Sequence, residues 1–435
     1  MNFEQQMKIL FIIPGSGDSF YCGNCFRDNL QATALRHAGH EVIVMPLYLP
    51  LTDQVFQANT PLFFPATTTY IAHSFFRKRP IPKWMERLFG SKSALKFAAS
   101  LAGSTSAEGM EDITLSMIYG DDNVFLEQVG SLINWIKNHE RPDIIHFSSS
   151  LLIGIAKAIK QQIQIPVVCS LQDEEVWIDS LKVKFSEIAW KGILENISYV
   201  DKYVTTSDFY RKVALSKIPQ FQEIEMIYPG VVIDQYASGT YPEYPVIGFF
   251  YRMNQLNGLD ILADAFVKLK SSNSIPNLKL KIGGGYTSHD KKFVRNIRKK
   301  LAPYANDVEF KEGYRLEDHT QFYCDISVIC VPIKFDEGVG LYLCEAFAAG
   351  RPAVEPATGS FEEVVADAGV VYSPNNSDAL ADALEKLLTD SALYQTCCQN
   401  ALRLSKNRYN SRVMAEKLVS LYNSTSIPPL ALGRY

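Results

Sequence analysis

Short apolar segments alternate with amphipathic helical segments along the whole chain, and this alternation constrains the fold most. Residues 8–13 form an apolar run that ends in a Pro–Gly pair, and a helical pattern follows over residues 25–37. A second strand is expected at 41–46, and the same order restarts at 246–251. Fully apolar strands separated by amphipathic helices are typical of parallel sheets covered on both faces. The sequence therefore predicts an α/β chain with two doubly wound, Rossmann-like domains facing a central cleft.

A Tyr/Pro/Gly-rich stretch at residues 236–245 marks the boundary between the two halves. We expect a first domain over 1–240, a second domain over 241–405 and a final helical segment over 406–435. An insertion at about 48–121 interrupts the first domain. Because doubly wound folds bind ligands at the carboxyl ends of their strands, we expect functional residues in the loops that follow those ends.

Composition narrows the class of protein. The 435 residues are 47% hydrophobic and 21% charged, which excludes disorder across most of the chain. The net charge of −4 gives no indication of a nucleic-acid partner. No apolar run approaches the length of about 18 residues that a membrane-spanning helix needs. The run at residues 9–13 is too short for a signal peptide, so a cytoplasmic location is expected. The eight cysteines lie mostly in apolar runs and do not predict a disulfide framework.

The insertion carries an unusual basic segment at residues 75–100. It contains seven basic residues and one acidic residue, with five aromatic residues between them. One interpretation is a solvated amphipathic helix over the first domain. The other is peripheral attachment to an anionic membrane surface, with the aromatic rings at the interface and the cations around them.

The strongest functional signal lies at residues 337–352, where Glu337 and Glu345 stand eight positions apart. Glu337 is expected in a glycine-rich loop after a strand, and Glu345 in the helix that follows. Gly338 and Gly340 let backbone N–H groups approach a ligand, and the helix N-terminus favours an anion there. A loop carboxylate can accept hydrogen bonds from sugar hydroxyls, whereas a helix carboxylate can hold a ribose diol. The alternative is that acidic residues gather at this helix start for dipole reasons alone.

This segment resembles the E-x7-E motif of retaining, nucleotide-sugar-dependent glycosyltransferases of the GT-B fold, specifically glycosyltransferase family 4. Residues 39–42 are similar to the family's G-H-E-V. Residues 229–231, with Asp234 just beyond, are similar to its P-N-G-V-D segment. Residues 359–365 resemble its G-G-x-x-E-V-V, and residues 408–422 its final helix, which crosses back to the first domain. The resemblance implies that the second domain binds the nucleotide sugar and the first domain binds the acceptor.

The resemblance also implies roles for single residues on the donor side. Glu337 would contact the donor sugar and Glu345 the nucleotide ribose, while Gly338 and Gly340, with Val339 between them, would line the donor.

The family's phosphate contacts come from an arginine and a lysine in a G-R-x4-K-G pattern. Arg252 matches the arginine, and Asn257 stands where the lysine is expected. This loss removes electrostatic stabilisation of the leaving diphosphate, although Asn257 can still donate a hydrogen bond. The remaining donor-side positions that the resemblance implies are Gly283, Gly284, Arg315 and Leu316.

A second departure lies in the first domain, where the family has a histidine near the reacting carbon and this chain has Gln172. Glutamine takes up no proton at neutral pH. In a front-face retaining transfer the leaving phosphate itself can accept the acceptor's proton, so Gln172 remains a candidate catalytic position. Asp173 adds a carboxylate beside it. The alternative for Asp173 is a solvated acidic loop that caps a strand.

Two more first-domain features are candidates for acceptor or phosphate binding. The glycine-rich loop after the first strand contains Gly15, Cys22 and Gly23, and Cys22–Gly23 falls on the family's G-G pair. Cys22 and Cys25 form a C-x-x-C pair, which also allows redox or metal chemistry, although no second half of a zinc site exists in the sequence. His146 ends an expected strand and is either an acceptor contact or a structural histidine.

The sequence thus predicts a hexosyltransferase that moves a sugar from a nucleotide-diphosphate donor to a hydroxyl acceptor. That acceptor is expected to be a lipid-linked or surface-polysaccharide precursor. Neither a cofactor nor a metal is expected, because Arg252 and helix N-termini can carry the phosphate charge. The alternatives are another reaction on the same fold, such as phosphorolysis or epimerisation, and a non-catalytic protein that binds nucleotide sugars.

Overall fold

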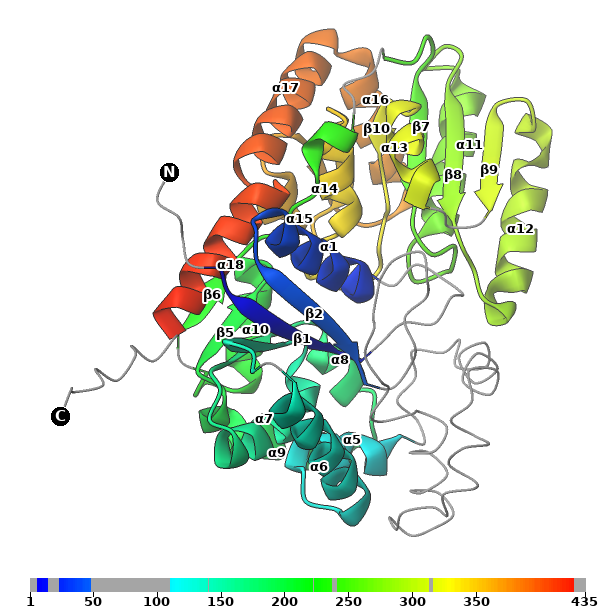
Figure 1. Cartoon of the computed structure of the whole chain (residues 1–435). Coiled ribbons are helices and arrows are strands. Elements are labelled where there is room, and N and C mark those ends of the chain that lie inside the picture. The colour runs from blue at the N-terminus through cyan, green and yellow to red at the C-terminus, as the bar shows by residue number, and fades with distance from the viewer. Residues whose placement is uncertain are drawn as a thin grey trace, which may run out of the picture.

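The computed structural model describes residues 6–14, 23–47, 110–139, 141–221, 223–236, 241–312 and 316–425, without the side chains of 23–25 and 316–319. Two parallel sheets, each with helices packed around it, make up the described chain (Figure 1). This arrangement confirms the predicted α/β architecture of two Rossmann-like domains.

The first sheet has six strands in the order β2-β1-β3-β4-β5-β6, and every pairing is parallel. In β1 (Lys8–Ile13) every residue after Lys8 is buried, because helices and the neighbouring strands cover it on all sides. Ile9 pairs with Val42 of β2 and with Ile144 of β3. The other strands of this sheet are β2 (Glu41–Pro46), β3 (Ile144–Phe147), β4 (Val167–Ser170), β5 (Lys202–Thr205) and β6 (Ile224–Met226).

The second sheet also has six parallel strands, in the order β12-β11-β10-β7-β8-β9. Its strands are β7 (Val246–Phe250), β8 (Lys279–Gly284), β9 (Val308–Glu312), β10 (Val328–Ile329), β11 (Ala353–Pro356) and β12 (Gly369–Tyr372). The chain reverses its direction of travel across the sheet after β9, next to β7. Such a reversal is the place where ligands bind in doubly wound folds.

Helices cover both sheets (Figure 1). In the first domain they are α1 (Gly23–His37), α5 (Glu111–Tyr119), α6 (Asn123–Asn138), α7 (Ile153–Gln162), α8 (Glu174–Ile178), α9 (Val183–Asn196) and α10 (Asp208–Lys217). In the second they are α11 (Leu259–Ser272), α12 (Lys291–Leu301), α13 (Leu316–Cys324), α14 (Leu341–Ala348), α15 (Phe361–Val365), α16 (Ser377–Thr389) and α17 (Ser391–Asn407). Short 3-10 helices span Ser150–Leu152, Ile197–Tyr199, Ile233–Gln235, Ser288–Asp290 and Ala302–Tyr304.

The last helix, α18 (Ser411–Thr425), runs from the second domain onto the first (Figure 1). Leu418 and Tyr422 of α18 are buried in one cluster with Ile9 and Phe11 of β1. In the other direction, Phe26 of α1 is part of the hydrophobic core of the second domain. The two domains therefore share buried apolar surface, which stabilises their contact.

Within the described ranges, no helix combines the length and the apolar character that crossing a membrane requires. The predicted insertion falls largely outside the description, since only its last part, from residue 110, is described. The basic segment 75–100 lies entirely outside the described residues. Membrane docking through that segment stays a prediction.

Candidate active site

The loop between β10 and α14 meets the first domain directly. Ser207, the residue before α10, donates a hydrogen bond from Oγ to the carbonyl oxygen of Gly338 at 2.6 Å. Asp173 also approaches this loop, since its Oδ1 lies 3.5 Å from the place a Cβ at Gly338 would occupy. The loop that the sequence singled out is therefore in contact with residues that follow two strands of the other domain.

Glu337 is half-buried in this loop. The hydroxyl of Tyr251 donates to its Oε2 at 3.4 Å, and the N–H of Gly340 donates to its Oε1 at 3.4 Å. Burial and the nearby carboxylate of Asp173 raise the pKa of Glu337 to about 7, against the opposing effect of the loop N–H groups. The Glu337 carboxyl group therefore gains and loses its proton near neutral pH.

A second loop, between β11 and α15, holds this first loop in place. The N–H of Ser360 donates to the carbonyl oxygen of Glu337 at 3.0 Å, and the N–H of Gly359 donates to Asp336 Oδ1 at 3.0 Å. Gly359 has a φ of +56°, and a Cβ there would lie 2.5 Å from the backbone of Glu337. The close approach of the two loops therefore requires glycine at this position.

Arg252 and Asn257 belong to one loop after β7. The guanidinium of Arg252 donates to Asp290 Oδ2 at 3.0 and 3.1 Å and to Thr287 Oγ1 at 3.2 Å. The side-chain amide of Asn257 donates to the carbonyl oxygen of Arg252 at 2.8 Å. Asn257 thus shapes the loop that carries Arg252, a role that the sequence did not reveal. Gly283 and Gly284 end β8 beside this loop, and the N–H of Tyr251 donates to the Gly283 carbonyl at 3.3 Å.

Glu345 is enclosed, with none of its surface exposed. Its Oε1 accepts a hydrogen bond from the Tyr236 hydroxyl at 2.7 Å, and its Oε2 accepts one from the Tyr323 hydroxyl at 2.9 Å. Tyr236 belongs to the segment between the domains and Tyr323 to α13. The carboxylate that was predicted to bind the ribose therefore accepts hydrogen bonds from two tyrosines. Neither tyrosine was identified from the sequence.

The residues that follow β4 have two different surroundings. Glu174 is buried and accepts hydrogen bonds from Ser149 Oγ at 3.0 Å and from the Ser150 N–H at 2.9 Å, so it holds the chain after β3. Gln172 is buried as well, and its side-chain amide donates to the Ser148 carbonyl. Asp173 faces the Glu337 loop.

His146 fits the structural alternative. It is completely buried, and its Nδ1 pairs with the Tyr422 hydroxyl at 2.6 Å and its Nε2 with Ser170 Oγ at 2.9 Å. Burial, with the positive charge of Arg27 adding to it, lowers the pKa of His146 to about 3. A neutral histidine thus ties β3 and β4 to α18.

Other predicted positions fall at or beyond the edges of the described chain. Gly15, Cys22 and Arg315 lie outside the described residues. Gly23 is the first residue of α1 and Leu316 the first residue of α13. Among the residues that the structure describes, no group of three or more His, Cys, Asp or Glu side chains could hold a metal ion.

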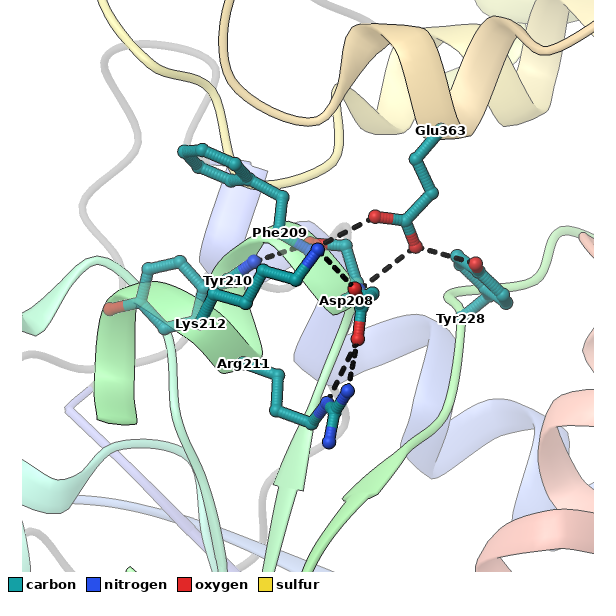
Figure 2. A network of polar contacts seen from close by, with 8 residues as sticks. Asp208, Phe209, Tyr210, Arg211, Lys212, Tyr228 and Glu363 are labelled. Atoms are coloured by element: carbon teal, nitrogen blue, oxygen red, sulfur yellow. Dashed lines mark hydrogen bonds and ion pairs between the residues drawn. The ribbon is translucent and has the colours of Figure 1, made fainter. Parts of the chain in front are cut away.

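No role for Glu363 was predicted from the sequence, yet this residue links the two domains (Figure 2). Its carboxylate, on α15, accepts hydrogen bonds from the N–H groups of Asp208 and Phe209 at 2.9 and 3.0 Å, at the start of α10. The Tyr228 hydroxyl donates to it at 2.5 Å. A helix N-terminus favours an anion, so Glu363 caps α10 from the other domain.

We expect Glu363→Gln to lower the free energy of unfolding by about 1–2 kcal/mol, because it removes the charge from this cap. Urea unfolding measures the change. Glu362→Gln is the matched control, since Glu362 is exposed on the same helix and should leave stability unchanged. Equal effects of the two substitutions would contradict a capping role for Glu363.

The comparisons with known proteins agree with this geometry. Residues 244–390 match the family described as "Glycosyl transferases group 1". The chain is 24% identical over 310 residues to YtcC of Bacillus subtilis (strain 168), which carries a provisional glycosyltransferase name, covering 66% of this chain and 74% of that protein. The curated relatives that follow are matched over 34%, 46% and 43% of their own length.

Solved structures show the same fold over nearly the whole chain. Sucrose-phosphate synthase from Thermosynechococcus elongatus superposes with a TM-score of 0.66 at 18% identity, covering 96% of this chain and 98% of that one. Anabaena Alr3699/HepE in complex with UDP-glucose gives 0.64 at 15% identity, covering 96% and 100%. With the matched glycosyl transferase domain and this fold, the chain is a glycosyltransferase enzyme of the GT-B architecture.

Proposed function

We propose that the chain is a retaining hexosyltransferase of glycosyltransferase family 4, which moves a sugar from a nucleoside-diphosphate donor to a hydroxyl acceptor. The observation that carries this proposal is the Glu337–Gly340 loop. It brings a carboxylate and backbone N–H groups to the start of α14, against Asp173 of the first domain. Such a loop suits a sugar with its hydroxyls and an anionic leaving group.

The donor's diphosphate is proposed to lie between the starts of α11 and α14, near Arg252. Asp290 and Thr287 hold the Arg252 guanidinium in a defined orientation, which lowers the entropy lost when it meets phosphate. In this proposal Gly338, Val339 and Gly340 line the donor, and no metal is needed for the phosphate charge. Asn257 acts through the loop of Arg252.

The ribose is proposed to meet Glu345. Because Glu345 has no exposed surface, this contact requires one of the two tyrosine side chains beside it to move and admit the ribose. The acceptor is proposed to enter from the first domain beside Gln172 and Asp173. A lipid-linked or surface-polysaccharide precursor, met at the cytoplasmic face of a membrane through residues 75–100, remains part of this proposal.

Nucleotide binding tests the donor half. A panel of nucleoside diphosphates and nucleotide sugars is added to the wild type, to Glu345→Gln and to Glu416→Gln, an exposed control. One nucleotide should raise the melting temperature of the wild type and of the control. Glu345→Gln should weaken its binding at least about tenfold, because a charged hydrogen bond is lost. No shift with any nucleotide contradicts the proposal.

Product analysis tests the retaining outcome. The sugar should keep its anomeric configuration when NMR follows the transfer from the donor that binds. Inversion contradicts the retaining assignment, and a sugar phosphate formed without an acceptor favours phosphorolysis.

A further inference from the structure

Helix α12 carries an unusual concentration of positive charge. Its 11 residues include no acidic residue, and all of its basic residues are exposed: Lys291, Lys292, Arg295, Arg298, Lys299 and Lys300. The chain as a whole has a net charge of −4, so the charge of this helix is opposite in sign. In Figure 1, α12 lies at the outer edge of the second domain.

The periodicity of the helix gathers these cations on one side. Val294, Ile297 and Leu301 are buried and belong to the hydrophobic core of the second domain. With about 3.6 residues per turn, the side that faces away from this core holds Lys291, Lys292, Arg295, Arg298 and Lys299. The helix therefore presents a continuous basic surface to solvent.

Two of the cations are paired with acidic side chains of neighbouring elements. Arg298 pairs with Glu312 of β9, and Lys300 pairs with Asp264 of α11. Within the part of the chain that the structure describes, the remaining cations form no ion pair, and they make up the cationic face of α12: Lys291, Lys292, Arg295 and Lys299.

Folding stability does not explain the cationic face. Lys291 and Lys292 occupy the first turn of α12, where the helix dipole favours an anion over a cation. Arg295 is four residues from Lys291 and four from Lys299, and like charges at this spacing destabilise a helix. These cations therefore destabilise the free protein, and an anionic partner would relieve their repulsion.

The chemistry of this face favours a lipid surface as the partner. Clusters of about four to eight lysines and arginines on an amphipathic helix are typical of binding to anionic phospholipids. The aromatic residue of α12, Phe293, is partly buried against the domain core. The helix therefore offers no exposed ring on which the bases of a single-stranded nucleic acid could stack.

We propose that the cationic face of α12 docks on an anionic phospholipid membrane. The attraction is electrostatic, because the apolar side of α12 is buried in the domain and does not enter the lipid. This surface is a different part of the chain from residues 75–100. Asp290, directly before α12, accepts hydrogen bonds from Arg252, so docking through α12 would bring the loop of Arg252 toward the membrane.

Vesicle co-sedimentation of the full chain tests this docking without any donor or acceptor. The probes are vesicles of phosphatidylcholine alone and vesicles in which about one third of the lipid is phosphatidylglycerol. The wild type should bind the anionic vesicles far more tightly, and raising the salt from about 0.1 M to about 0.5 M should release it. Lys292→Gln combined with Arg295→Gln should weaken binding about thirtyfold, since each cation near an anionic surface contributes about fivefold.

The matched control removes two exposed lysines from other helices of the same domain, through Lys386→Gln on α16 and Lys406→Gln on α17. This control should bind the vesicles as the wild type does. Without vesicles, the melting temperature of the α12 double variant should equal or exceed that of the wild type, because like charges are removed from one helix.

Equal vesicle binding by the wild type and the α12 double variant, or binding by neither, overturns the docking. Equal losses in the α12 and control variants show a general effect of net charge and overturn it as well. Binding to a short double-stranded DNA, lost in the α12 variant and without vesicle binding, assigns the face to nucleic acid instead. A lower melting temperature of the α12 variant assigns these cations to folding and contradicts the docking. Nucleotide binding is measured separately, so the proposed transferase function does not depend on any of these results.

Discussion

Glu337→Gln is expected to lower kcat/KM for sugar transfer by about 10²–10³-fold, the usual effect of removing one preorganised electrostatic contact from a transition state. Positive charge develops on the sugar ring as the bond to the diphosphate breaks, and the Glu337 carboxylate lies in the loop proposed to hold that ring. Glutamine keeps the shape and a hydrogen-bonding oxygen but removes the charge. Nucleotide affinity should change little, because binding of the nucleotide alone does not develop this charge.

The same residue predicts a pH dependence. Since the pKa of Glu337 is raised to about 7, its carboxylate is lost as the pH falls through neutrality. The kcat/KM of the wild type should therefore decline below about pH 7, approaching tenfold per pH unit, as expected for one protonation of the free enzyme. The Glu337→Gln variant should lack this limb, and steady-state rates between pH 5.5 and 8.5 measure both profiles.

Glu337 also makes the free energy of unfolding depend on pH, but in the direction opposite to the activity. Between the ordinary glutamate pKa of 4.5 and about 7, the folded chain holds a proton that the unfolded chain has released. The contribution of Glu337 to the free energy of unfolding therefore falls as the pH rises through that window. Glu362→Gln, exposed on α15, is the control for both measurements. A pH profile in Glu337→Gln identical to that of the wild type would contradict the assignment to this carboxyl.

The sequence was sufficient to predict the loop to which this chemistry is assigned by the proposal. The eight-residue spacing of Glu337 and Glu345 placed one in a loop and the other in a helix, and the structure has α14 beginning at Leu341. The strand expected at 8–13 matches β1, and the strand expected at 41–46 matches β2. These elements could be predicted because local periodicity and their terminal residues determine them.

Contacts between distant segments could not be predicted from the spacing of motifs. Glu363 lies 155 residues from Asp208, whose N–H it accepts, and Tyr236 lies 109 residues from Glu345. These pairs come together only through long-range packing, which no local sequence pattern predicts.

Gly258→Ala is expected to lower the free energy of unfolding by about 2–5 kcal/mol. Alanine is strained in the left-handed backbone conformation of this position, and its methyl group would overlap a neighbouring atom. Gly258 precedes α11 with a φ of +73°, and a Cβ there would lie 1.8 Å from the carbonyl oxygen of Pro332. Because this oxygen belongs to the backbone, the overlap is relieved only if the loop after β10 moves. Urea unfolding measures the loss.

The substitution should also disturb the proposed donor site. Gly258 follows Asn257 in the loop after β7 that carries Arg252, and the displaced loop after β10 continues to Glu337. Nucleotide affinity should therefore fall even under conditions where the variant remains folded. Gly130→Ala is the matched control, because Gly130 lies within α6 and a Cβ there meets nothing within 4 Å. It should stabilise the chain by about 0.5–1 kcal/mol through the helix preference of alanine. Similar unfolding free energies for the two variants would show that the loops after β7 and β10 are not packed as closely as this structure has them.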